Sequence, residues 1–142
     1  MARPIKCRKV EFLPETTQFI PLGKEKTKEI VLKVEELEAM RLKDIENLTQ
    51  QECADIMGVS RQTFQNIIDT ARKKVALALT KGHAINIKGG NYAFKHCELK
   101  CQACNKNYEV EFVRDKKICP KCHSEEVVCK SKKKACKNLC TK

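Results

Sequence analysis

Four cysteines form two closely spaced pairs in the C-terminal third of the chain. Cys101 and Cys104 are separated by two residues, as are Cys119 and Cys122, and fourteen residues lie between the pairs. Each pair fits a tight turn whose two thiolates converge on one metal ion. Two such turns complete a tetrahedral shell around Zn²⁺ and leave no position for water. The spacing therefore predicts a closed, structural zinc site rather than a catalytic one.

The residues around these pairs are typical of a small β module resembling a zinc ribbon, over residues 96–129. Asn105 and His123 directly follow the two pairs, where the turn needs a positive φ that Asn and His tolerate. That backbone role explains His123 without making it a metal ligand. Residues 108–113 alternate like a strand. A module this small buries little apolar surface, so a structural metal is the natural source of its stability.

Four further cysteines leave two interpretations open. They are Cys97, Cys129, Cys136 and Cys140. They could form a second metal site, with His96 contributing. Alternatively, residues 130–142 are a Lys-rich and Cys-rich tail with almost no apolar residues, which is typical of a disordered basic segment.

Residues 48–64 (LTQQECADIMGVSRQTF) predict a helix, a short turn and a second helix. Ala54 is small where the two helices must approach each other. Gly58 suits the left-handed backbone that ends the first helix, and Ser60 is a favourable N-cap for the next. The apolar residues expected to close the two helices on each other are Cys53, Met57, Val59, Phe64 and Ile67.

The polar residues left on the outer face of the second of these helices predict contact with DNA. The predicted contacts at its start are Ser60, Arg61, Gln62, Thr63, Gln65 and Asn66. In the major groove, Arg pairs with guanine, while Gln and Asn suit adenine. Further along, Arg72, Lys73 and Lys74 are expected to contact phosphates, which position a protein without reading sequence. The alternative is an ordinary helical hairpin with a solvated polar face.

These residues must be held by a domain over residues 1–95. Apolar spacing predicts a helix over 34–47, with three glutamates suited to its N-terminal dipole, a second over 49–57 and a long third over 60–81. Residues 84–92 predict a strand followed by a Gly-Gly turn. We therefore expect a mainly α fold: a helix-turn-helix domain, a small β zinc-ribbon module and a tail.

The first thirty residues are interrupted by prolines and are predicted to be irregular. They open with a basic cluster of Arg3, Lys6, Arg8 and Lys9. This cluster is either an N-terminal arm that reaches a minor groove or phosphates, or a solvated terminus.

Composition narrows the class of protein. The 142 residues include 29 Lys and Arg against 18 Asp and Glu, a net charge of +11 that favours a polyanionic partner. No apolar run is long enough to span a membrane, and the N-terminus has no signal-peptide core. We expect a cytoplasmic protein, in which ten cysteines suit metal better than disulfides. No phosphate-binding Gly loop or His–nucleophile constellation is visible, so we do not expect an enzyme.

Four stretches resemble one family of small prokaryotic proteins, known as domain of unknown function 134. They are the opening MARP, VEELEAMRL over residues 34–42, MGVSRQTF over 57–64, and Gly89-Gly90-Asn-Tyr. The resemblance covers about residues 1–95 and implies a DNA-binding helix-turn-helix similar to the fourth region of sigma-70 factors. It implies base reading by Arg61, Gln62, Gln65 and Asn66. One departure is Lys33, where a Ser or Thr cap is expected before the first helix.

Three functions follow from these observations. The first is a sequence-specific DNA-binding transcriptional regulator with structural zinc. The second is a metal or redox sensor in which the cysteine module modulates DNA binding. The third is an adaptor whose ribbon binds RNA polymerase or RNA. Double-stranded DNA is the expected partner, a homodimer is a further expectation, and no membrane partner is expected.

Overall fold

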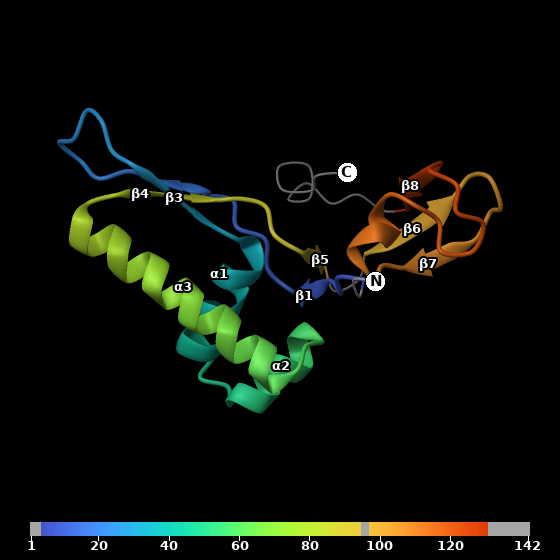
Figure 1. Cartoon of the computed structure of the whole chain (residues 1–142), viewed down its shortest axis with the longest axis horizontal. Helices are drawn as coiled ribbons and strands as arrows, with labels where there is room; N and C mark the ends of the chain where they lie inside the picture. The colour runs from blue at the N-terminus through green and yellow to red at the C-terminus, as the bar shows by residue number, and fades with distance from the viewer. Residues whose placement is uncertain (1–3, 95–96, 131–142) are drawn as a thin grey trace.

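The computed structural model describes residues 4–94 and 97–130. In this part of the chain, three α-helices and eight strands form, and the strands make three small sheets (Figure 1). Of the described residues, 36% are helical and 22% lie in strands. The expectation of a mainly α fold is therefore wrong, and the protein is of mixed α and β structure. The N-terminal strands have only two to four residues, too few to display a clear alternation of apolar and polar side chains.

Three helices and a π-helical segment form the helical layer. They are α1 (Val34–Met40), η1 (Arg41–Ile45), α2 (Gln50–Met57) and α3 (Arg61–Lys81). The Thr49 hydroxyl accepts the N–H of Glu52 at 3.1 Å, and the Ser60 hydroxyl accepts the N–H of Thr63 at 3.0 Å. Gly58 adopts a φ of 68° between α2 and α3. The predicted helix, turn and helix are thus confirmed, because their caps are encoded locally.

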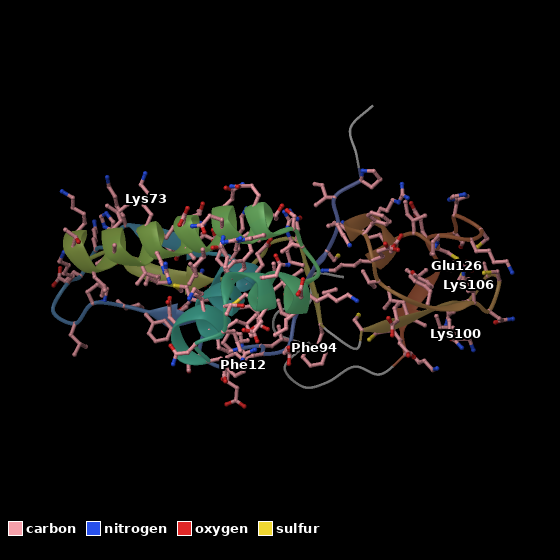
Figure 2. The ribbon with its side chains drawn as sticks, turned by 90° about the horizontal axis from the view of Figure 1, so that it is seen from below. Phe12, Lys73, Phe94, Lys100, Lys106 and Glu126 are labelled. Carbon is pink, nitrogen blue, oxygen red and sulfur yellow. The ribbon has the colours of Figure 1, made fainter. Side chains whose placement is uncertain are left out.

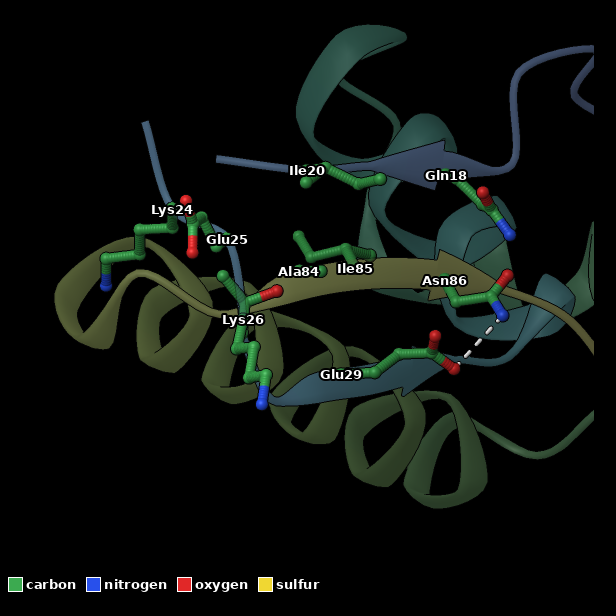
Figure 3. Close-up of a pocket in the computed structure, with 10 residues that line it drawn as sticks. Gln18, Ile20, Lys24, Glu25, Lys26, Glu29, Ala84, Ile85 and Asn86 are labelled. Carbon is green, nitrogen blue, oxygen red and sulfur yellow. Dashed lines mark hydrogen bonds between the residues drawn. The ribbon is translucent and has the colours of Figure 1, made fainter. Parts of the chain in front are cut away.

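Two sheets involve the N-terminal thirty residues, which were predicted to be irregular. In one, β1 (Arg8–Val10) pairs in parallel with β5 (Tyr92–Phe94). In the other, β4 (Ala84–Ile87) lies between β2 (Gln18–Phe19) and β3 (Glu29–Leu32), antiparallel to the first and parallel to the second. Figure 3 shows this second sheet with α3 behind it. The chain therefore pairs its N-terminal strands with the segment that follows α3.

The cysteine-rich segment forms the third sheet, at the opposite end of the molecule from β3 and β4 (Figure 1). Its strands are β6 (Glu98–Cys101), β7 (Asn107–Glu109) and β8 (Val127–Cys129), in the order β7-β6-β8. The strand predicted over residues 108–113 ends at Glu109. A 3₁₀ turn, η2 (Val113–Lys116), follows, and the buried Asp115 carboxylate accepts the N–H of Phe112 at 3.0 Å to cap it.

The N-terminal segment joins this cysteine module to the helical layer. The N–H of Cys7 donates to the carbonyl of Glu111 at 2.9 Å, and the N–H of Val113 donates to the carbonyl of Ile5 at 2.9 Å. The Cys7 side chain is 2% exposed and packs in the core of the module. Beyond it, Arg8 enters β1. Residues 5–7, called the N-terminal strap below, therefore lie against the module instead of forming a detached arm.

Three glutamates of α1 are buried and link the helix to its surroundings by hydrogen bonds and ion pairs. Glu35, Glu36 and Glu38 are 4%, 4% and 1% exposed. The sequence pattern suggested only that they suit the helix dipole, but each carboxylate accepts a backbone N–H from outside α1. Glu35 accepts from Asn91, Glu36 from Lys33 and Glu38 from Glu11. Each also meets a cation: Arg8, Lys74 and Arg41 respectively.

The Lys33 position illustrates how this arrangement replaces a conventional cap. Lys33 has no side-chain oxygen, but its own N–H donates to the Glu36 carboxylate at 2.8 Å. The helix therefore begins at Val34 without a Ser or Thr, because a carboxylate three residues into the helix can satisfy the backbone before it.

Gly90 offers a direct test of the Glu35 contact. Its φ is 110°, and a Cβ built there would clash with a Glu35 carboxylate oxygen and lie 3.2 Å from the Lys33 Cβ. Gly89 also has a positive φ, 71°, but a Cβ there has nothing within 4 Å. We expect Gly90→Ala to lower the free energy of unfolding by about 2–4 kcal/mol and Gly89→Ala by about 1–2 kcal/mol, in urea denaturation. Equal losses would show that the Glu35 contact is dispensable.

Candidate metal centre and nucleic-acid interface

Four sulfur atoms converge between the two cysteine turns of the module. The Sγ atoms of Cys101, Cys104, Cys119 and Cys122 all lie within 4.8 Å of one another. Cys101 and Cys122 are 3.5 Å apart, and Cys104 and Cys119 are 3.7 Å apart. A tetrahedron with metal–sulfur bonds of about 2.3 Å has sulfur–sulfur edges of about 3.8 Å. The predicted ligand set therefore comes together with the spacing that a tetrahedral metal ion requires.

The backbone turns that present the two pairs are closely alike. The N–H of Asn105 donates to the Cys101 carbonyl at 2.8 Å, and the N–H of His123 donates to the Cys119 carbonyl at 2.9 Å. Asn105 and His123 have φ values of 62° and 63°. The prediction that both residues serve the turn is confirmed, and His123 lies outside the group of converging ligands.

The four sulfurs differ in their environments: burial and the neighbouring thiols raise the pKa of Cys122 to about 12, whereas Cys119 is held in its anionic form. The backbone N–H groups of Cys122 and Lys121 lower the pKa of the Cys119 thiol to about 6, and the Lys121 N–H donates to Cys119 Sγ at 3.4 Å. Metal ions bind thiolates rather than thiols, so this environment favours the ligand form. Nearby, burial raises the pKa of Tyr108 to about 12, and its neutral hydroxyl donates to the Asp115 carbonyl at 2.6 Å.

The possible second metal site is not assembled by the described residues. Across residues 4–94 and 97–130, the four cysteines above are the only group of three or more potential ligands close enough to hold an ion. Cys97 and Cys129 are partly buried and pack against the core of the module. Cys136, Cys140 and His96 lie outside the described residues.

The predicted DNA-contacting residues gather at the start of α3. Ser60, Arg61, Gln62 and Asn66 are exposed, and Thr63 and Gln65 are partly buried. Thr63 is engaged by the cap, with its hydroxyl 2.9 Å from that of Ser60. The outer residues form two side-chain ladders: Gln62 donates to Asn66 at 3.1 Å, and Gln65 donates to Asp69 at 2.7 Å.

These residues border an open depression between the two helices. Gln50, Arg61, Gln62 and Gln65 line it. Gln50 was missed by sequence reasoning, although its place as the first residue of α2, directly after the Thr49 cap, was a usable signal. No ion pair is seen for Arg61 among the described residues, so its guanidinium is available to a ligand.

The three basic residues further along α3 differ from one another. Arg72 forms a bidentate ion pair with Asp44, and this hydrogen bonding raises the pKa of the Arg72 guanidinium. Lys74 contacts the buried Glu36 at 2.6 Å. Lys73 is exposed and points away from the body of the protein (Figure 2). Of the three predicted phosphate contacts, only Lys73 has no ion pair within the described chain.

The fold and the site define a small protein of mixed α and β structure, with a helix-turn-helix unit and a four-cysteine group that could hold a metal ion. The family model described as protein of unknown function DUF134 matches residues 1–95, and the chain belongs to this family. Within the described part of the chain, no helix combines the length and apolar character needed to cross a membrane.

Close relatives extend over the cysteine module as well. A UPF0251 protein of Clostridium novyi (strain NT) is 58% identical over 144 residues, covering 100% of this chain and 98% of that protein. A UPF0251 protein of Clostridium botulinum (strain 657 / Type Ba4) is 58% identical over 142 residues, covering 99% of this chain and 90% of that protein. No solved structure matches the chain.

The geometry of the residues that the structure describes predicts one metal site. Titrating the metal-free protein with Co²⁺ is expected to reach saturation at one equivalent, with the strong sulfur-to-metal absorption of a tetrahedral thiolate site. Cys104→Ala should abolish this spectrum, whereas Cys129→Ala, which changes a cysteine outside the converging group, should preserve it. A second equivalent with thiolate absorption would contradict the single-site assignment.

Proposed function

We propose that the protein is a sequence-specific DNA-binding transcriptional regulator that inserts the start of α3 into the major groove. The observation that carries this proposal is the surface formed by Arg61, Gln62, Gln65 and Asn66. These side chains are mostly exposed and bear hydrogen-bonding groups, while the opposite side of α3 is buried through Phe64 and its apolar neighbours. A helix with one face locked in a core can present the other in a fixed orientation, as base recognition requires.

Each side chain would have a distinct role in reading DNA. The guanidinium of Arg61 can donate two hydrogen bonds to guanine, and the amides of Gln62, Gln65 and Asn66 can pair with adenine. The two ladders hold these amides in place before binding, which reduces the entropy lost on binding. Lys73 would contact phosphate directly. Arg72 and Lys74 would have to give up ion pairs to do so, and we assign them to holding α3 in place.

We further propose that the metal is zinc and that its role is structural. A closed set of four thiolates suits Zn²⁺ and leaves no ligand position for water. Bound zinc would join the turns at Cys101 and Cys119, which otherwise rest on a small core. Four thiolates with one Zn²⁺ would carry a net charge of about −2, and the backbone N–H groups facing Cys119 favour its anionic form.

Substitutions at Arg61 and Lys73 separate base reading from phosphate contact. Arg61→Ala should weaken binding to the preferred site by about 1–3 kcal/mol and relax specificity at one base pair. Lys73→Ala should weaken binding to all DNA sequences alike and reduce the dependence of affinity on salt. Fluorescence anisotropy on specific and scrambled duplexes, each at several salt concentrations, measures both effects. If Arg61→Ala reduced affinity for both duplexes equally, the base-reading role would be rejected.

The N-terminal strap favours a second candidate, a regulator whose metal module modulates DNA binding. The strap is hydrogen-bonded to Glu111 and Val113 of the module. The next residue, Arg8, lies 3.2 Å from the Glu35 carboxylate of α1, and α1 contacts α3 through Glu36 and Lys74. A continuous set of contacts therefore connects the module to the helix proposed to read DNA, although coupling itself needs to be measured.

Metal removal tests this second candidate. If the module controls the helices, complete chelation should lower affinity for the preferred DNA about 5- to 150-fold, the usual range of coupling between sites. Arg8→Gln weakens the link between the strap and Glu35. The variant should still bind the metal, but the ratio of its DNA affinities measured with and without metal should be smaller than for the wild-type chain. Unchanged DNA affinity after verified metal loss would leave the metal with a purely structural role.

A further inference from the structure

A contiguous apolar surface extends from the N-terminal segment to the end of α3. Two open depressions form it and share Phe19. One is lined mainly by Phe12, Leu13, Pro14 and Leu37, and the other by Ile20, Pro21 and Leu79. In Figure 2, Phe12 and Lys73 lie on opposite sides of the molecule. The depression lined by Phe12 therefore lies on the side away from Lys73.

The apolar surface also has a projecting side chain that its own chain does not bury. Leu22 follows Pro21 in the turn between β2 and β3 and is 100% exposed, directly before Gly23 at a φ of 81°. Leu79 and Ile20 are 79% and 65% exposed. One face of the protein thus combines unfilled apolar depressions with unburied apolar projections, which is the self-complementary arrangement that a two-fold interface needs.

We propose that a second copy of this chain occupies the apolar surface, forming a two-fold symmetric homodimer. The five exposed side chains Phe12, Phe19, Ile20, Leu22 and Leu79 are between 48% and 100% exposed. At ~200 Å² for a fully exposed large side chain, they offer on the order of 600 Å² of apolar area. A standard interface buries about 800 Å² per partner, of which roughly 65% is apolar in homodimers. The available area therefore matches the apolar core of such an interface.

The charges beside the apolar surface favour a second copy over an acidic or a basic partner. The hollow on the outer face of the β2-β4-β3 sheet is lined by Lys24, Glu25, Lys26 and Glu29 (Figure 3). Lys24 also donates to the carbonyls of Lys81 and Gly82 at the end of α3. In a two-fold arrangement, lysines of one copy can meet glutamates of the other. A partner of single charge sign would leave two of these four groups facing like charges.

The dimer is tested in the absence of DNA, so its outcome is independent of the proposed function. Sedimentation analysis of the full, metal-loaded chain up to about 100 μM should show a monomer–dimer equilibrium. Leu22→Asp and Leu79→Asp should each raise the dimer dissociation constant at least ~10-fold. Ile45→Asp is the matched control, because Ile45 is 72% exposed but lies in η1, outside both depressions and outside the turn that carries Leu22, and it should leave the constant unchanged.

Thermal unfolding of each variant checks that the fold is retained. Leu22 makes no buried contact, so Leu22→Asp alone carries the test if Leu79→Asp proves unstable. A wild-type chain that stays monomeric throughout would overturn the proposal, as would an assembly larger than a dimer. A dimer that is insensitive to Leu22→Asp, or one that Ile45→Asp weakens equally, would place the interface elsewhere and would also overturn it.

Discussion

The buried carboxylates of α1 are the constraint on which the arrangement of the protein depends. Removing a carboxylate from water costs several kcal/mol unless hydrogen bonds and a cation compensate. Glu35, Glu36 and Glu38 each receive a backbone N–H and a cation. Arg8 and Glu11 of the N-terminal segment, Lys74 of α3 and Asn91 of the loop before β5 supply four of these six partners, and Lys33 and Arg41 adjoin α1 itself. The three carboxylates are therefore fully satisfied only when all of these segments are in place. The short N-terminal strands gain a fixed position that their own pairing would not supply.

This constraint also determines which residues are left to act on other molecules. Lys74 serves Glu36, and Arg72 serves Asp44, so both hold α3 instead of extending from it. Arg61, Gln62 and Lys73 remain exposed on its outer face. The cysteine module is connected to the same network through the strap and Arg8. A change at the four cysteines therefore has a physical route to α3 that consists of backbone hydrogen bonds and a partly buried ion pair.

The features predicted correctly from the sequence are those encoded by neighbouring residues. The Thr49 and Ser60 caps, the Gly58 turn and the two cysteine turns each depend on a few adjacent positions. The features that were missed depend on distant partners. The sequence places three glutamates near the start of a helix, but only the fold brings Arg8, Glu11, Lys74 and Asn91 to them. The three strands before residue 33 gave no recognisable sequence pattern, because each is short and pairs with a strand that follows α3, far away in the sequence. A mainly α fold was expected for this reason.

The most direct test of the central proposal is selection of binding sites from a pool of random duplex DNA, using the full, metal-loaded chain. The account predicts enrichment of one motif, and the identity of one base pair in that motif should become degenerate when Arg61→Ala is used in the same selection. Retention of DNA without any enriched sequence, or a motif unchanged by Arg61→Ala, would contradict the assignment of α3 as a base-reading helix.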